Sequence, residues 1–325
     1  MLKSIYIFSL LFFIIICIIP FRDYSITYLE PKINATEKKD PEDRFVTTAL
    51  KKEYVEESLI YFTEAKDLNK DAPMVSAESA LVIDMNTNKI IYAKNEEVKK
   101  PVASLAKVMT AIIAVEHAKM DEKIKISSTA AKVGENTMGL KKDEKFTLEE
   151  LLYGLILDSG NDSAYAIAEH VGKTEQEFVK FMNRKANLLG AYNTKFVDSS
   201  GLNSQNKEFY STAIDMAKMA VYSQNNHKEL KKIYATFIKE LPETEEHEYK
   251  YLENQTNLLT TYPGDGGMKT GYTEEAGLCL ISYAENDGKK VLVVILYSTD
   301  RRGDSILLLD YGFNQLGVHV EHNLL

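Results

Sequence analysis

The sequence predicts an α+β fold, in which an antiparallel sheet has flanking helices and an inserted, mainly helical lobe. Strand-like segments lie near residue 80 and again after residue 266, and helical patterns and loops fill the roughly 170 residues between them. An economical arrangement pairs the first hairpin with the last strands in a single sheet, which leaves roughly residues 105–260 as the lobe. We therefore expect a functional site between the sheet and the lobe.

Five segments account for the predicted sheet. The segments 79–84 and 89–93 are rich in apolar and β-branched residues and flank a short polar turn, which is a hairpin pattern. Three more strand-like segments follow in the C-terminal third. The last two of these are joined by Glu285-Asn286-Asp287-Gly288, whose Asp-Gly pair is typical of a tight hairpin turn. The three segments are 267–271, 277–284 and 291–298.

Helices are expected through the middle of the chain and near its end. Thr147-Leu148-Glu149-Glu150 has the spacing of a capping box, so a helix should begin there and end near Leu157. Ser211 is placed to cap another helix, whose inner face carries Met216 and Met219 as core residues. The other helices are expected at about 104–117, 162–171, 175–189 and 304–311.

Composition restricts the classes of function. The 325 residues are 45% hydrophobic and 27% charged, which is ordinary for a globular chain able to bury a full core. A net charge of −9 repels phosphate backbones, so no nucleic-acid partner is expected. Apart from Cys17 in the first apolar run, the chain has one cysteine, Cys279, so the folded part cannot form an internal disulfide. The six histidines lack metal-ligand spacing, and we expect no metal and no other cofactor.

The first 21 residues indicate export. Lys3 precedes an apolar run over 5–19, as in a signal segment, but no small-residue cleavage site follows. We favour an uncleaved membrane anchor over a cleaved signal, a lipoprotein signal at Cys17 or a buried core helix. The folded part is then expected outside the cytoplasmic membrane.

The rest of the chain divides into a stalk and a folded domain. Residues 22–75 are polar and poor in glycine, and a ragged apolar face within them predicts a helix over 51–68. The domain is expected over 76–325.

Ser104-Leu105-Ala106-Lys107 places a hydroxyl and an amine three residues apart near a helix start. Residues at this spacing share a helix face, and a helix N-terminus favours developing negative charge at the serine. In isolation, an N-cap serine followed by a solvent-facing lysine is the better explanation of this pattern. Here, however, the residues that follow, 108–113, are almost all apolar. A lysine one turn into a buried helix costs folding free energy unless its charge is paired or the side chain has a functional role.

Two further short motifs lie in a predicted helix break and on a predicted strand. Ser159-Gly160-Asn161 is explained, by itself, as a turn followed by an Asx cap. Lys269-Thr270-Gly271 puts a glycine on a strand, which weakens the strand unless a ligand or another backbone must approach closely. Each motif alone is weak evidence, but all three in this order on a helix, a loop and a strand form a specific signal.

Together the three motifs resemble the signature of the penicillin-binding proteins and serine β-lactamases, whose transpeptidase-like fold is therefore expected. Residues 151–162 and 267–277 are similar to the low-molecular-mass D-alanyl-D-alanine carboxypeptidases of the peptidase S11 type. The resemblance covers roughly residues 76–316. It implies a serine-type enzyme that removes the terminal D-Ala from peptidoglycan stem pentapeptides and that β-lactams inhibit covalently. Many members carry a second domain and a C-terminal anchor that this sequence lacks, so the expected anchor is N-terminal.

The resemblance implies catalytic roles for the first two motifs. Ser104 would form the acyl-enzyme, and Lys107 would be its base. Burial and the charge of Lys269 are expected to lower the pKa of Lys107, so that its amine is neutral. Ser159 would relay a proton to the leaving D-Ala amine, and Asn161 would hold the substrate amide and Lys107.

The third motif is implied to bind substrate. Lys269 and Thr270 would hold the terminal carboxylate, and Gly271 would let the substrate lie against the strand. The backbone N–H groups of Ser104 and Tyr272 would form an oxyanion hole.

Two features near the implied site stay open. Arg301 or Arg302 would lie near the carboxylate, or both would form a solvated loop pair. The segment 197–200 lacks the Pro or His often found there in the family, which leaves the shape of the cleft undetermined.

Three other functions fit the same motifs. A β-lactamase would need a deacylating glutamate, and the nearby candidates Glu169, Glu175 and Glu177 all fall on predicted helices. A D,D-endopeptidase would perform the same chemical step on a bulkier leaving amine. An inactive wall-binding or penicillin-sensing module would keep the fold without the chemistry.

Overall fold

A computed structural model describes residues 59–66 and 68–324 of the chain. The predicted anchor, and the predicted stalk up to residue 58, lie outside these residues and stay predictions, as does the boundary at residue 76. No helix within the described ranges is long and apolar enough to cross a membrane.

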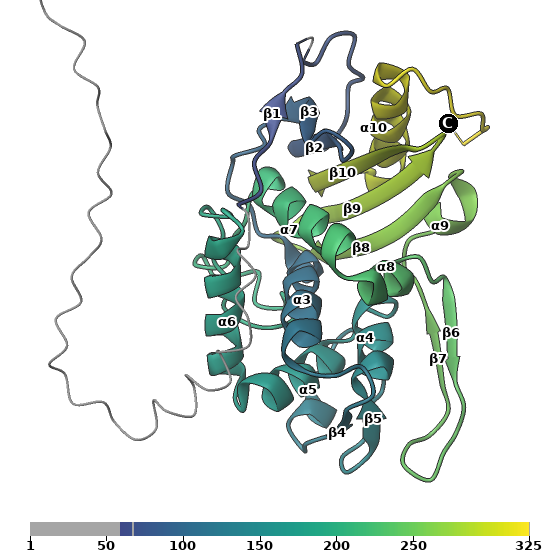
Figure 1. The fold of residues 1–325 in the computed structure, drawn as a ribbon. Coiled ribbons are helices and arrows are strands. Elements are labelled where there is room, and N and C mark those ends of the chain that lie inside the picture. The colour runs from purple at the N-terminus through teal and green to yellow at the C-terminus, as the bar shows by residue number, and fades with distance from the viewer. Residues whose placement is uncertain (1–58, 67, 325) are drawn as a thin grey trace, which may run out of the picture. The chain divides into compact units, whose positions relative to one another are not determined.

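A six-stranded sheet forms the centre of the described structure, in the order β1-β3-β2-β10-β9-β8 (Figure 1). All neighbours run antiparallel except β1 and β3, which are parallel. The first hairpin pairs directly with the last strands, with Val82 opposite Val293. The predicted fold class is therefore confirmed. The strands are β1 (Thr63–Glu64), β2 (Ser79–Asp84), β3 (Lys89–Lys94), β8 (Asp265–Thr273), β9 (Gly277–Asn286) and β10 (Lys289–Ser298).

Helices cover both faces of this sheet. The C-terminal helix packs on one face against Val82 and Val291, and the inserted lobe packs on the other face against Leu81 and Val294 (Figure 1). Side chains alternate between these two cores because successive residues of a strand point to opposite faces. The helices are α3 (Lys107–His117), α4 (Leu148–Ile156), α5 (Asn161–Gly172), α6 (Glu175–Leu188), α7 (Ala213–Asn226), α8 (Lys228–Tyr234), α9 (Leu258–Thr261) and α10 (Arg301–Gln315), with short 3-10 turns η1 (Ala103–Ala106) and η2 (Ala130–Lys132).

The helix starts test the local predictions. The capping box at Thr147 is present, because its side chain accepts from Glu150 N and Glu150 accepts from Thr147 N. The next predicted cap is wrong by one residue: the side chain that accepts from Asp215 N at the start of α7 belongs to Thr212, not Ser211. The predicted helix over 51–68 is also wrong in its described part, where residues 63–64 form β1 instead.

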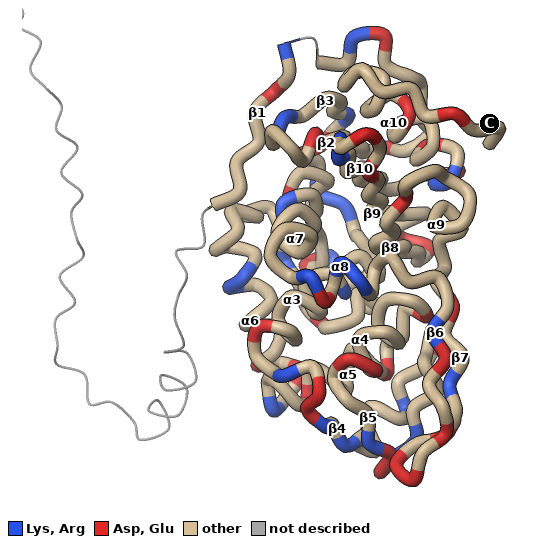
Figure 2. The backbone as a smooth tube through the Cα atoms, turned by 45° about the vertical axis from the view of Figure 1, so that its right-hand side comes forward, with Lys and Arg blue, Asp and Glu red and all other residues tan. Residues whose placement is uncertain are grey.

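The lobe also contains two small antiparallel sheets of two strands each, β4 (Lys123–Lys125) with β5 (Lys145–Thr147), and β6 (Ile238–Leu241) with β7 (Lys250–Glu253). Charged residues of both signs gather around these two small sheets (Figure 2). Glu246, which lies between β6 and β7, forms ion pairs with Lys123 of β4 and Lys145 of β5. These ion pairs tie the β6–β7 hairpin to the rest of the lobe. After β7 the chain continues into α9 and β8.

Candidate active site

Ser104 lies on the 3-10 turn η1, directly before α3, rather than inside an α-helix as expected. Lys107 is the first residue of α3, and its Nζ lies 2.9 Å from Ser104 Oγ. The Ser-x-x-Lys spacing therefore brings the two groups together, as predicted from the sequence. Ser104 is half-buried, whereas Lys107 is 0% exposed.

Three acceptors surround the Lys107 ammonium position. Besides Ser104 Oγ, Lys107 Nζ donates to Asn161 Oδ1 at 2.8 Å and to Ser200 O at 2.7 Å. Burial lowers the pKa of Lys107 to about 7, although the carboxylates of Asp198 and Asp162 oppose this shift. An amine with this pKa is partly neutral at neutral pH and can accept a proton from the serine hydroxyl.

The loop before Gly201 borders this site and contacts Lys107. Asp198 holds it by accepting hydrogen bonds from Ser200 N at 2.8 Å and Asn203 N at 3.1 Å, and a further one from Gly201 N. These bonds aim the Ser200 carbonyl at Lys107. The sequence left the shape of this loop open, and the structure shows it in direct contact with the lysine.

Gly201 lies against the turn that carries the nucleophile candidate. A Cβ at Gly201 would fall 1.9 Å from Ala103 O and 3.2 Å from Ser104 N, and the φ of Gly201 is +80°. Ala103 itself has a φ of +47°, a conformation that costs about 1–2 kcal/mol for a residue with a Cβ. Packing by Gly201 and by the sheet holds this strained turn in place.

The second motif joins α4 to α5. Asn161 is the first residue of α5; its side chain accepts from Lys107 and donates to Gly134 O at 3.1 Å. Ser159 is 1% exposed and has a φ of +58°. Its Oγ has no hydrogen-bond partner within the described part of the chain. A buried hydroxyl in this state is available for a bound group.

The third motif lies on the edge strand β8. Lys269 is buried, and burial, together with the charges of Lys107 and Arg301, lowers the pKa of Lys269. Thr270 Oγ1 donates to Gln255 Oε1 at 3.1 Å. A Cβ at Gly271 would lie 3.0 Å from Val102 O and 3.3 Å from Ser104 N. This glycine therefore allows β8 to approach η1 closely.

The two arginines point in different directions. Arg301 Nη1 donates to Gly271 O at 3.1 Å, so Arg301 lies at the third motif. Arg302 Nη1 instead makes a long contact of 3.5 Å with Leu324 O. Both belong to the first turn of α10 and not to a loop. Tyr272, the next residue of β8 after Gly271, is 61% exposed.

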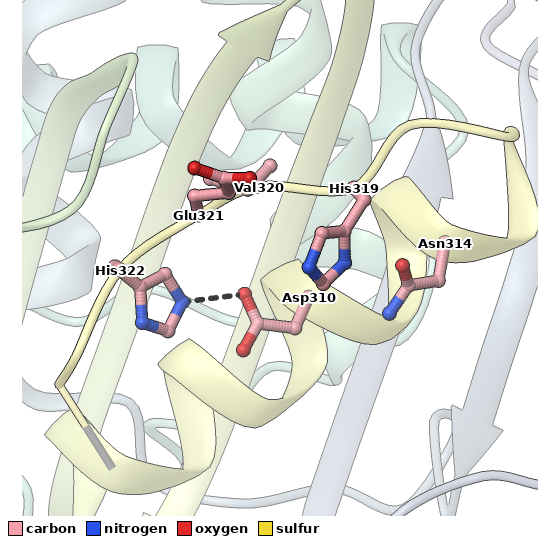
Figure 3. Close-up of a pocket in the computed structure, with 6 residues that line it drawn as sticks. All are labelled: Asp310, Asn314, His319, Val320, Glu321 and His322. Carbon is pink, nitrogen blue, oxygen red and sulfur yellow. Dashed lines mark hydrogen bonds and ion pairs between the residues drawn. The ribbon is translucent and has the colours of Figure 1, made fainter.

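Cavities of the described structure include the following two. One, of about 440 Å³, lies beside the third motif and is lined by Gln255, Asn257, Leu280, Arg301 and Arg302, among others. The other, of about 250 Å³, lies between α10 and the C-terminal segment and contains no motif residue (Figure 3). There His322 Nε2 and Asp310 Oδ1 are 2.8 Å apart. Within the described ranges no cluster of His, Cys, Asp and Glu side chains could hold a metal ion.

Sequence reasoning missed three contributors to this site. Gln255 lies in a polar segment without a motif and contacts Thr270 only through the tertiary fold. Ser200 contributes a backbone carbonyl, which no side-chain pattern reports. Asp198 belongs to the segment 197–200, whose shape the sequence left open, and its hydrogen bonds to backbone N–H groups have no sequence signal.

The sheet with its inserted lobe, and the three motifs that meet beside Ser104, define a class of serine enzymes that includes the DD-transpeptidases. A solved structure of a mutant DD-transpeptidase from Streptomyces K15 has a TM-score of 0.71 and 29% sequence identity, covering 74% of this chain and 99% of that one. Residues 66–299 match the family model described as Peptidase S11, D-alanyl-D-alanine carboxypeptidase. The chain therefore belongs to this family, and the resemblance drawn from the motifs is confirmed.

Curated relatives agree with this assignment. The D-alanyl-D-alanine carboxypeptidase DacF of Bacillus subtilis is 35% identical over 75% of this chain and 64% of its own length. The matched part of the chain thus spans less than two thirds of that relative. The D-alanyl-D-alanine endopeptidase of Escherichia coli is 31% identical over 69% of this chain and 72% of its own length.

Proposed function

We propose that this protein is a serine-type D-Ala-D-Ala carboxypeptidase, which removes the terminal D-Ala from peptidoglycan stem pentapeptides and binds β-lactams covalently. One observation carries the proposal. A fully buried lysine, with its pKa lowered to about 7, lies 2.9 Å from the hydroxyl of Ser104. This is the geometry of a nucleophile with its general base.

Acylation begins when neutral Lys107 takes the proton of Ser104 and the serine oxygen attacks the carbonyl of the penultimate D-Ala. The C–N bond then breaks, and the leaving amine receives a proton through Ser159. The unpartnered, buried Oγ of Ser159 supports this role. Asn161 holds Lys107 at 2.8 Å and presents its amide to the substrate. Water then attacks the ester, again with Lys107 as base, and releases the shortened peptide.

The terminal carboxylate of the substrate binds at the third motif. On binding, the Thr270 hydroxyl gives up its hydrogen bond to Gln255 Oε1 and donates to the carboxylate instead, and Lys269 and Arg301 supply positive charge. A bound carboxylate favours the charged form of Lys269 and so offsets the burial that lowers its pKa. Gly271 lets the peptide lie along β8. The backbone N–H groups of Ser104 and Tyr272 stabilise the oxyanion, at about 3–4 kcal/mol per donor in comparable acyl transfers.

The same proposal includes a location. The enzyme acts on the extracytoplasmic face of a bacterial membrane, with residues 1–21 as an uncleaved anchor, 22–75 as a stalk and 76–325 as the catalytic domain. The apolar run after Lys3 supports the anchor. Mass spectrometry of the protein from the membrane fraction tests it, and a mature N-terminus beyond residue 20 would overturn it.

The catalytic proposal is tested with two assays on the same variants: release of D-Ala from a pentapeptide and covalent labelling by fluorescent penicillin. Ser104→Ala should abolish both signals. Ser128→Ala, a change of the same kind at an exposed position, should keep both. Either signal surviving in Ser104→Ala would move the nucleophile elsewhere. A wild-type protein that gives neither signal, or that hydrolyses penicillin within seconds, would overturn the assignment.

A further inference from the structure

The hydrogen-bond acceptors around Lys107 Nζ are all uncharged groups. They are Ser104 Oγ, Asn161 Oδ1 and the backbone carbonyl of Ser200. In the proposed reaction Lys107 takes the proton of Ser104 and becomes an ammonium, although its side chain is 0% exposed. A buried charge of this kind costs free energy unless an opposite charge compensates it. The site therefore needs a negative group beyond the direct contacts of Lys107.

One of the three acceptors leads to a carboxylate through a single peptide unit. The carbonyl of Ser200 and the N–H of Gly201 belong to the same amide group. The oxygen of this amide accepts from Lys107 Nζ at 2.7 Å, and its N–H donates to Asp198 Oδ1. Hydrogen bonds that follow one another in this way polarise one another. The charge of Asp198 therefore strengthens the acceptor that Lys107 faces.

The other two acceptors of Lys107 do not lead to a carboxylate. Asn161 accepts from Lys107 through Oδ1, and its Nδ2 donates to the carbonyl of Gly134, which is neutral. Ser104 Oγ is the proposed nucleophile, and its own proton is the one that moves. Of the three contacts, the one with Ser200 is thus the route by which a negative charge can act on the base through hydrogen bonds.

Asp198 is fixed in its loop by the hydrogen bonds that it accepts. It is 4% exposed, and its Oδ1 accepts from Ser200 N at 2.8 Å and from Ser200 Oγ at 3.0 Å. Its Oδ2 accepts from Asn203 N at 3.1 Å. Both oxygens are therefore acceptors, which is the pattern of an ionised carboxylate. A negative charge is thus held in a defined position, one peptide unit away from Lys107.

Charged groups of four other elements surround this pair. Burial lowers the pKa of Lys107, and Asp198 opposes this shift more strongly than any other carboxylate does. Asp162 comes next, but its oxygens accept from the backbone N–H groups of Met138 at 2.9 Å and Leu140 at 3.0 Å, and so hold that segment instead. The groups that face Lys107 are Asp162 of α5, Glu135 in the loop after η2 and Lys269 of β8, and the group that faces Asp198 is Glu175 of α6.

We propose that Asp198 is a positioning residue for the general base. Through the Ser200–Gly201 peptide unit it orients the Lys107 amine toward Ser104 and stabilises the ammonium that forms during acylation. In that step the proton of Ser104 Oγ moves to Lys107 Nζ, and Ser104 Oγ forms its bond to the substrate carbonyl carbon. The inference rests on the proposed function, because it concerns the same step.

The test measures the acylation rate of the full chain by fluorescent penicillin from about pH 5 to about pH 9. In the wild type the rate should rise with a midpoint at about pH 7. Asp198→Asn removes the charge and keeps one oxygen acceptor. Its midpoint should lie about one pH unit lower, because no carboxylate then favours the ammonium form of Lys107, and its plateau rate should fall. Asp198→Glu keeps the charge and should keep the midpoint near that of the wild type.

Asp84→Asn is the matched control. Asp84 is also buried, and it also accepts from a backbone N–H two residues further along the chain, that of Asn86, at 2.9 Å. The strand register places Asp84 level with Asp265, at the opposite end of β8 from Gly271. The control variant should therefore keep the wild-type midpoint.

The outcomes separate a role in positioning the base from a purely structural one. Asp198→Ser, a neutral residue that also favours this kind of turn, should show the same shift and replaces Asp198→Asn if that variant fails to fold. Slower acylation with an unchanged midpoint in the neutral variants would overturn the inference and leave the proposed function standing. Equal shifts in Asp198→Glu and Asp198→Asn would also overturn it. A wild type that takes no label contradicts the proposed function itself.

Discussion

Replacing Gly201 by alanine should disturb the turn that carries Ser104. The added Cβ would lie 1.9 Å from Ala103 O and 2.5 Å from Ala103 C, far inside contact distance, and both are backbone atoms that cannot rotate away. The same Cβ would lie 3.2 Å from Ser104 N. Any relief of the overlap therefore moves the backbone on which the proposed nucleophile and one oxyanion donor sit.

The size of the effect has two parts. Gly201 has a φ of +80°, and this left-handed conformation costs about 1–2 kcal/mol once a Cβ is present. Overpacking against backbone adds about 1–3 kcal/mol. Gly201→Ala should therefore destabilise the fold by about 2–5 kcal/mol. Gly288→Ala isolates the first part, because Gly288 has a φ of +71° and nothing within 4 Å of its Cβ position. It should cost about 1–2 kcal/mol.

Thermal unfolding and the rate of acylation by fluorescent penicillin measure the two consequences. Gly201→Ala should unfold at a lower temperature than Gly288→Ala. Below its unfolding temperature it should acylate about 10²–10³-fold more slowly, as expected when one oxyanion donor is displaced. Gly288→Ala should acylate at the wild-type rate, since Gly288 lies in the β9–β10 turn. If the two variants matched in both stability and acylation, contact between Gly201 and the Ser104 turn would have no functional consequence, and the reasoning would be refuted.

Three further outcomes are expected. The acylation rate should rise with pH through about 7, because the buried Lys107 amine is the base only when it is neutral. An acylation rate that does not change between about pH 5 and about pH 9 would contradict this. Thr212→Ala should lower the free energy of unfolding by about 1 kcal/mol through loss of the α7 cap, whereas Thr212→Ser should retain it in chemical denaturation. Burial raises the pKa of Asp265 to about 6. The free energy of unfolding should therefore fall as the pH rises from the ordinary pKa of an aspartate toward 6, because the folded state holds the proton more tightly than the unfolded state. Asp265→Asn should flatten that part of the profile of unfolding temperature against pH. A variant profile that runs parallel to that of the wild type would show that Asp265 does not cause this pH dependence.

Local patterns in the sequence were sufficient to predict much of the fold. Short runs of apolar and β-branched residues located β2, β3, β9 and β10, and the capping box at Thr147 marked the start of α4. These features depend on neighbours within a few residues, which the sequence displays directly. The predicted helix over 51–68 failed in its described part because its ragged apolar face carried little periodic information, and tertiary pairing with β3 makes residues 63–64 a strand.

The sequence also determined which residues belong to the candidate site. Ser104, Lys107, Asn161 and Lys269 were found because side-chain chemistry recurs in short motifs, and because a lysine in an apolar helix needs an explanation. Their spatial meeting follows from the fold. The roles assigned to them stay predictions that the assays above test.

Tertiary structure alone decided the details on which chemistry depends. It separated Arg301, which reaches Gly271, from Arg302, which turns toward the C-terminal segment. It aimed the Ser200 carbonyl at Lys107 and placed Gln255 beside the third motif. Backbone carbonyls, close approaches across distant segments and cavity volume arise from contacts between residues far apart in the chain. No local pattern encodes such contacts, because their energies depend on how the whole chain packs.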